Sequence, residues 1–166
     1  MTTSGKTREN QAASPETLVG DAIAQCGDAP DALLPVLHAV QEAAGYVPAD
    51  AVPMIAAALN LSRAEVHGVL TYYPHFRERP PGRHLVQLCR AESCQACGGD
   101  ALAARAEQLL GCAMHDTRAD GAVTLEPVYC LGLCACSPAA MIDGQLHGRL
   151  SPESFEQIAA AAGVLA

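Results

Sequence analysis

The sequence predicts an α+β protein in which a bundle of helices comes first and a domain of mixed sheet and helix follows it. Three observations support this prediction. Residues 15–78 carry helix-start signals and apolar side chains at helical spacing, residues 78–82 (ERPPG) form a turn-rich break, and residues 82–166 alternate strand-like with helix-like runs. We therefore expect a flexible tail over residues 1–14, a helical domain over residues 15–78 and a second domain over residues 82–166.

The helical domain is predicted from the signals at which helices start and stop. Residues 14–16 (SPE) begin a first helix, because serine caps free backbone amides and proline fits the first turn. Asp31 is expected to cap a second helix, which ends at Gly45, and Asp50 is expected to begin a third. Residues 62–65 (SRAE) form a capping box for a fourth helix.

The second domain follows a different pattern. We expect a strand over residues 84–88, an amphipathic helix over residues 100–110, short strands over residues 122–125 and 139–142, and a capped last helix over residues 151–162. The resulting order β, α, β, β, α is that of a small thioredoxin-like domain.

Composition narrows the classes of function. The chain has 166 residues, half of them hydrophobic, so it can bury a core without disulfides, and its eight cysteines point to metal or redox chemistry. The N-terminus lacks the apolar core of a signal peptide, and no run approaches about 18 uninterrupted apolar residues. We expect a cytoplasmic location without direct membrane insertion. A net charge of −8 leaves no basic face for phosphates, which argues against nucleic acid as a partner.

Four of the cysteines form two closely spaced pairs. Cys89 and Cys94 are separated by four residues, in the loop that leaves the first predicted strand. Cys130 and Cys134 are separated by three residues, in a loop between later strands. Two loops at the same end of a sheet, each giving two thiolates, can hold a [2Fe-2S] cluster.

Two other kinds of site would use some of the same residues. The four thiolates could bind zinc, although these spacings lie at the edge of the range that zinc sites use. Cys94 and Cys97 form a C-x-x-C between a strand and a helix, as in dithiol redox proteins, but this interpretation leaves the cysteines around Cys130 unexplained. Cys26 and Cys112 stand alone and are expected to be small buried hydrophobic residues.

Longer motifs carry a resemblance to a known family. The segments "CRAESC" and "YCLGLCACSPA", separated as above, resemble the [2Fe-2S] subunits of the family that includes the 24-kDa subunit of respiratory complex I. "LLPVLHAVQEAAGYVPADAV" and "LNLSRAEVHGVLTYYPHF" resemble the N-terminal helical region of that family, so the likeness covers residues 16–162. In finer detail, "CRAESCQACGG" and "LEPVYCLGLCACSPA" resemble most the gamma subunit of soluble NAD-dependent molybdenum formate dehydrogenases.

The resemblance implies a thioredoxin-like [2Fe-2S] ferredoxin domain after the helical bundle. It also implies four cluster ligands: Cys89, Cys94, Cys130 and Cys134. Cys97 and Cys136 then lie outside the ligand set. Each is two or three residues from a proposed ligand, so a shift of register would exchange it for that ligand.

The resemblance further implies an assembly of several chains. This chain would exchange single electrons with a flavoprotein subunit that binds FMN and NAD, while a catalytic subunit with the molybdenum cofactor would oxidise formate. The chain has no G-x-G-x-x-G after a strand and no P-loop, so we expect no nucleotide site on it. It also shows no Ser/His/Asp or paired-carboxylate arrangement, so we expect no catalytic residues on this chain. The alternatives are the equivalent subunit of complex I or of an NAD-reducing hydrogenase and, more distantly, a zinc-binding interaction module.

Overall fold

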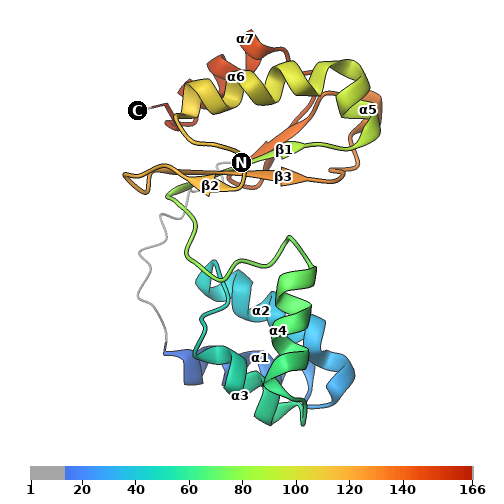
Figure 1. The fold of residues 1–166 in the computed structure, drawn as a ribbon, viewed down its shortest axis with the longest axis vertical. Coiled ribbons are helices and arrows are strands. Elements are labelled where there is room, and N and C mark those ends of the chain that lie inside the picture. Colours follow the sequence, from blue (N-terminus) through green and yellow to red (C-terminus); the bar gives the residue numbers. More distant parts are fainter. Residues whose placement is uncertain (1–13, 166) are drawn as a thin grey trace, which may run out of the picture. The chain divides into compact units, whose positions relative to one another are not determined.

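The computed structural model describes residues 14–165, which form two compact units joined between Pro80 and Pro81 (Figure 1). The first unit is helical and the second contains a five-stranded sheet, so the α+β prediction is confirmed. The tail expected over residues 1–14 lies outside the described residues, apart from Ser14. None of the helices between residues 14 and 165 is long and apolar enough to cross a membrane.

Four α-helices build the first unit. They are α1 (Pro15–Cys26), α2 (Leu33–Ala44), α3 (Ala51–Ala58) and α4 (Arg63–Tyr72). A short 3-10 helix, η1 (Pro30–Ala32), leads into α2. The helices share one apolar core, and its fully buried members include Val36, Leu37, Val40, Ile55 and Val66. This core belongs to the first unit alone, because every residue in it precedes Pro80.

Most of the expected helix signals act as predicted. The Ser14 side chain accepts a hydrogen bond from the Thr17 amide at 3.3 Å, and α1 begins one residue later. Ser62 and Glu65 form the reciprocal capping box of α4, with the Ser62 amide 2.8 Å from the Glu65 carboxylate. Gly45 ends α2 with a φ of 86°, a left-handed conformation that glycine adopts without strain.

The expected cap of α2 was wrong. Asp31 lies inside η1, and the N-cap position of α2 is Ala32, which provides no side-chain hydrogen bond. Pro30 starts the extra 3-10 turn, so the helical path begins before the residue that looked like a cap. Asp50 does precede α3, but its side chain makes no capping hydrogen bond.

The five strands found between residues 14 and 165 all lie in the second unit. Its strands are β1 (His84–Cys89), β2 (Asp116–Thr117), β3 (Val123–Val128), β4 (Ala140–Ile142) and β5 (Gln145–His147). Its helices are α5 (Glu92–Cys94), α6 (Asp100–Leu110) and α7 (Pro152–Ala161), with a π-helical turn η2 (Gln95–Gly99) and a 3-10 turn η3 (Cys134–Cys136). The sheet order is β2-β3-β1-β4-β5. Only β1 and β3 are parallel among the strand pairs of the described chain.

Helices α6 and α7 pack together over one face of this sheet (Figure 1). Val86 of β1 lies in register with Leu125 of β3 and with Ile142 of β4, and all three side chains are buried in the core beneath the helices. Phe155 of α7 is fully buried in the same core. Neighbouring residues point to the opposite face, where Gln87 donates a hydrogen bond to Glu126 at 3.2 Å.

Replacing Leu37 with alanine should strongly destabilise the helical unit. Leu37 is fully buried in α2, so the substitution removes apolar contacts and leaves a cavity. We expect the free energy of unfolding to fall by about 2–5 kcal/mol in urea titrations followed by circular dichroism. Leu34→Ala is the matched control, because Leu34 lies in the same helix but is 37% exposed, and it should cost about 1 kcal/mol or less. Equal losses in the two variants would contradict the described packing.

Candidate metal centre

The candidate site lies where the parallel strands β1 and β3 end. Cys89, the last residue of β1, is in register with Val128, the last residue of β3. The Arg90 amide donates to the Val128 carbonyl at 2.7 Å, and the Cys89 amide donates to the Ala139 carbonyl at 3.0 Å. Because parallel strands finish at the same edge of a sheet, the two cysteine-bearing loops leave it side by side.

The first pair of cysteines is buried. Cys89 ends β1, Cys94 ends the short helix α5, and burial together with the Cys94 thiol raises the pKa of Cys89. Both side chains pack with Ala139, and the partly buried Val128 and Leu131 border this cluster. The core of the domain therefore fixes the first pair.

Arg90 anchors the loop that carries this pair. Its guanidinium donates to the Gly99 carbonyl at 3.1 Å and forms an ion pair with Asp100 at 2.7 Å. The Gln95 side chain donates to the Arg90 carbonyl at 2.6 Å. Arg90, which precedes α5, is thereby connected to the start of α6 and to Gln95 at the start of η2.

The second pair of cysteines is exposed. The sulfur atoms of Cys130 and Cys134 are 3.8 Å apart, and the Gly132 amide donates to the Cys130 sulfur at 3.3 Å. Gly132 has a φ of 76° and Cys130 a φ of 144°, so the backbone of this loop turns sharply around the sulfur. A residue other than glycine is strained at such a φ, and strain of this kind is characteristic of functional sites.

Two serine side chains connect the loops. Ser93 lies between the first two cysteines, Ser137 follows the second pair, and their hydroxyl oxygens are 2.9 Å apart. Both hydroxyls reach the Cys134 carbonyl, Ser93 at 3.2 Å and Ser137 at 3.0 Å. The Cys94 thiol donates to the Ser137 hydroxyl oxygen at 3.4 Å.

Burial and hydrogen bonding oppose each other at the first pair. Burial raises the pKa of the Cys89 thiol, and the adjacent Cys94 thiol raises it further. Burial also opposes ionisation of Cys94. Hydrogen bonds with Ser137, Cys89 and the Ala139 backbone outweigh that burial, so the pKa of Cys94 lies below its ordinary value. Cys94 is thus the thiol of this pair that its surroundings favour as a thiolate.

The second pair is electrostatically connected to the first. The hydrogen bond and charge repulsion from Cys130 raise the pKa of the Cys134 thiol, and repulsion from Cys94 and Cys89 raises it further. Cys134 is therefore close enough to the first pair to interact with it electrostatically. Among residues 14–165, no three His, Cys, Asp or Glu side chains converge as a single metal ion would require. The sulfurs are arranged as two pairs, one from each loop.

The remaining cysteines lie elsewhere. Cys97 is exposed in η2, and the backbone at Cys97 and Gly98 departs from helical geometry. Cys136 packs against Gly148, at which a Cβ atom would lie only 2.8 Å from the Cys136 Cβ. Cys26 and Cys112 are half-buried and pack against the helical core and the sheet core respectively.

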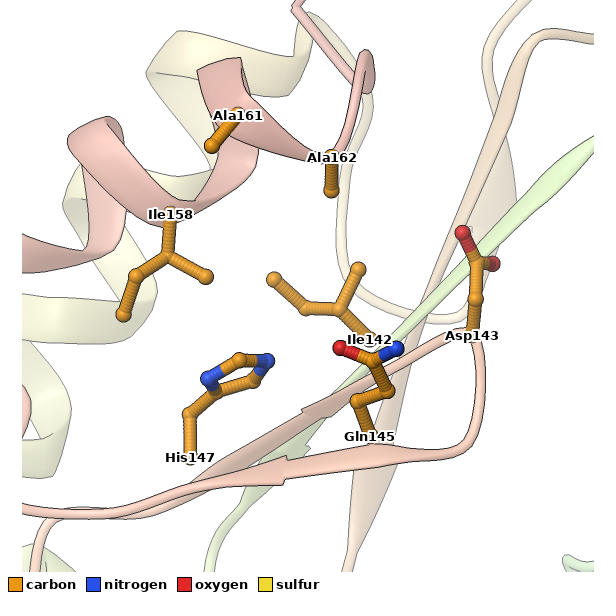
Figure 2. A pocket seen from close by; sticks show the side chains of 7 residues that line it. All are labelled: Ile142, Asp143, Gln145, His147, Ile158, Ala161 and Ala162. Carbon is orange, nitrogen blue, oxygen red and sulfur yellow. The ribbon is translucent and has the colours of Figure 1, made fainter. Parts of the chain in front are cut away.

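A separate hollow of about 450 Å³ lies between the β4–β5 hairpin and the end of α7 (Figure 2). The strand side is formed by Ile142, Gln145 and His147, and the helix side by Ile158, Ala161 and Ala162. Asp143 at its rim is held by hydrogen bonds to the His84 ring at 2.7 Å and to the Leu85 amide at 2.8 Å. No cysteine is among the residues that line this hollow.

Sequence reasoning missed the roles of Arg90, Ser93 and Ser137. Their positions beside the cysteines are visible in the sequence, but a short spacing does not show which side chains meet across two loops 41 residues apart, as Ser93 and Cys134 do. For Ser93 and Ser137, the signal in the sequence is the presence of a serine in each cysteine-bearing loop.

The donor set fits a four-thiolate [2Fe-2S] cluster. Such clusters take four cysteine sulfurs, and amide hydrogen bonds to the sulfurs adjust their properties. Here two loops supply four thiols in two pairs, and the Gly132 amide already donates to one sulfur.

Comparisons with known proteins agree with this chemistry. The model of the thioredoxin-like [2Fe-2S] ferredoxin family matches residues 19–162. The E subunit of NADH-quinone oxidoreductase from Pseudomonas aeruginosa is 35% identical over 127 residues, which are 76% of each chain. The second E subunit from Rhizobium meliloti is 36% identical over 137 residues, 82% of each chain. The E subunit from Mycobacterium tuberculosis is 35% identical over 131 residues, 79% of this chain but only 52% of its own length.

A solved structure shares the fold. A chain of the NAD+-reducing [NiFe]-hydrogenase in the H2-reduced state superposes with a TM-score of 0.68 at 22% identity. The match covers 84% of the present chain and 23% of the hydrogenase chain.

Replacing Gly99 with alanine should displace Cys94. The new Cβ would lie 2.6 Å from the Cys94 carbonyl oxygen and 2.9 Å from its carbonyl carbon, and backbone atoms must move to relieve such contacts. We expect a loss of about 1–3 kcal/mol in urea unfolding and faster reaction of Cys94 with a thiol reagent.

Gly20→Ala is the control for this substitution. Gly20 lies within α1 with no atom within 4 Å of the added Cβ, so alanine should stabilise the helix by about 0.5–1 kcal/mol. A neutral Gly99→Ala variant with unchanged thiol reactivity would show that Gly99 does not position Cys94.

Proposed function

The chain belongs to the thioredoxin-like [2Fe-2S] ferredoxin family, and from this membership we propose that it is an electron-transfer subunit that holds one [2Fe-2S] cluster. The proposed ligands are Cys89, Cys94, Cys130 and Cys134. The observation that carries this proposal is that the two loops leaving the parallel strands β1 and β3 at one edge of the sheet each carry a pair of cysteines.

The residues around the site suit this role. When bound, a cluster of this kind accepts and releases one electron at a time. The buried pair, Cys89 and Cys94, would anchor it to the domain core, and Ala139 with Leu131 would limit the access of water. The exposed pair, Cys130 and Cys134, would lie on the side that a partner can approach. Exposed Tyr129, next to Cys130, adds a large aromatic surface on this side.

The proposed partner is a flavoprotein subunit that binds FMN and NAD. The chain lacks the glycine-rich loops that bind nucleotides, so hydride chemistry requires another subunit. A flavin can accept a hydride and pass on single electrons, which matches a one-electron cluster. The names of the relatives support an NAD-linked assembly, since they are subunits of NADH-quinone oxidoreductases. We place this assembly in the cytoplasm.

Within this class we propose a soluble formate dehydrogenase with a molybdenum-containing catalytic subunit. The support is the resemblance of "CRAESCQACGG" and "LEPVYCLGLCACSPA" to the gamma subunit of such enzymes. The equivalent subunit of complex I is the second candidate, favoured by the names of relatives at 35–36% identity. The NAD-reducing hydrogenase equivalent has the support of the shared fold alone.

The metal content tests the first part of the proposal. Protein prepared without oxygen should contain about two irons and two acid-labile sulfides per chain, because four thiolates complete a two-iron cluster. Serine at any proposed ligand should abolish or strongly perturb the visible and electron paramagnetic resonance spectra. One zinc without sulfide would instead establish the zinc-binding module.

Matched cysteine variants separate ligands from other thiols. Cys26→Ser and Cys112→Ser should retain the cluster, because these residues pack against the apolar cores. Cys97→Ser should retain it as well, since Cys94, and not Cys97, packs with Cys89 in the buried cluster around Ala139. Cluster loss in Cys97→Ser with retention in Cys94→Ser would move the ligand assignment to Cys97.

Purification of the native assembly tests the second part. The full chain, tagged in the cell that encodes it, should co-purify with FMN and molybdenum in an assembly that reduces NAD+ with formate. Flavin and molybdenum are measured by fluorescence and elemental analysis. A membrane-bound assembly that oxidises NADH with a quinone and contains no molybdenum would support the complex I candidate instead.

A further inference from the structure

The two bridging serines form a small network whose protons can be counted. Ser137 Oγ has three neighbours: the Cys94 sulfur at 3.4 Å, the Cys134 carbonyl at 3.0 Å and Ser93 Oγ at 2.9 Å. Ser93 Oγ is also 3.2 Å from the Cys134 carbonyl. Each hydroxyl has one proton to donate, so the network has two protons for the Cys134 carbonyl and the Cys94 sulfur.

With Cys94 as a thiol, the protons have a simple distribution. The Cys94 thiol donates to Ser137, and Ser137 donates to the Cys134 carbonyl. A cysteine bound to iron has lost its proton and can only accept. The hydrogen bond between Cys94 and Ser137 can then persist only if its direction reverses and the Ser137 proton turns toward sulfur.

Ser93 lowers the free-energy cost of this reversal. If the Ser137 proton leaves the Cys134 carbonyl, Ser93 can donate to the same carbonyl, because both hydroxyls already lie within reach of it. Loss of the hydrogen bond to this carbonyl without a replacement would otherwise oppose the reversal. The second serine therefore supplies the proton that the first one gives up.

The backbone around Ser137 is fixed on both sides. The carbonyl of Cys136 accepts from the Arg149 amide at 2.6 Å, and the carbonyl of Pro138 accepts from the Leu150 amide at 3.0 Å. Ala139, two residues on, accepts from the Cys89 amide at 3.0 Å. The Ser137 hydroxyl is thus held beside Cys94 by backbone hydrogen bonds from the end of β1 and from the segment that follows β5.

We propose that Ser137 is a positioning residue that donates a hydrogen bond to the Cys94 sulfur of the bound cluster, and that Ser93 supports it by taking over the Cys134 carbonyl. This inference rests on the proposed function, because it requires Cys94 to be a ligand. A donor to a cluster sulfur stabilises the reduced form more than the oxidised form, since reduction adds negative charge. The serine pair therefore raises the midpoint potential of the cluster.

The test is a redox titration of the full-length protein, followed by electron paramagnetic resonance. Ser137→Ala should make reduction about tenfold less favourable, which for one electron is a shift of about 59 mV to lower potential. Ser93→Ala should shift the potential in the same direction by a smaller amount, because Ser137 must then share its proton between carbonyl and sulfur. In the Ser137→Ala background, Ser93→Ala should cause no further shift.

Two further variants serve as controls. Ser137→Thr keeps the hydroxyl and should restore most of the potential. Thr117→Val removes another hydroxyl that pairs with a hydroxyl of the same unit, Thr124 Oγ1 at 2.7 Å, and it should leave the potential unchanged. If Ser137→Ala does not retain its cluster, the midpoint potential of Ser93→Ala becomes the test. An unchanged potential in Ser93→Ala would then overturn the inference.

The outcomes separate this inference from the proposed function. An unchanged potential in Ser137→Ala with full iron and sulfide content would overturn the role of Ser137 and leave the cluster assignment intact. Additive shifts in the two serine variants would overturn the proton exchange between them. Wild-type protein without iron and sulfide would overturn the cluster assignment, and this inference with it.

Discussion

The parallel pairing of β1 with β3 is the interaction on which the site depends. It runs in register from His84 opposite Val123 to Cys89 opposite Val128, so both strands finish at one edge of the sheet. The α6 crossover that parallel strands require packs its buried residues Leu102, Ala106 and Leu110 onto the same core. The apolar core thus brings together two loops that are about 40 residues apart in sequence, as in the bond from Ser93 to the Cys134 carbonyl.

The two cysteine pairs are held by different means, and this difference has an electrostatic consequence. Packing fixes Cys89 and Cys94, whereas a tight loop around Gly132 shapes the exposed Cys130 and Cys134. Burial raises the pKa of Cys89, and the neighbouring Cys130 sulfur raises the pKa of Cys134. Four thiolates at this place therefore need compensating positive charge, so binding of iron is coupled to the release of protons from the thiols.

The sequence predicted the long elements better than the contacts of the site. Helix α6 occupies residues 100–110 as expected, and its apolar spacing is long enough to show helical periodicity. The strands β2 and β5 were missed, because two or three residues are too few to show alternation. The predicted cap at Asp31 was wrong because Pro30 begins a 3-10 turn, and this turn places Asp31 inside a helical segment rather than before it. The proposed ligands come from spacing and resemblance, while the serine bridge depends on two loops meeting and has no local signature.

The proposed site leaves the choice of substrate to other subunits. Four thiolates around a cluster form no pocket for a substrate, so in the proposed assembly the partner subunits would set the overall chemistry. What this chain can adjust is the potential of the electrons that it passes and the surface that it presents to a partner. Both properties lie in the residues between and beside the cysteines, such as Ser93, Tyr129 and Ser137, rather than in the cysteines themselves. Substitutions at these neighbouring positions can therefore change the potential or the docking surface while the sheet and the thiol spacing stay the same.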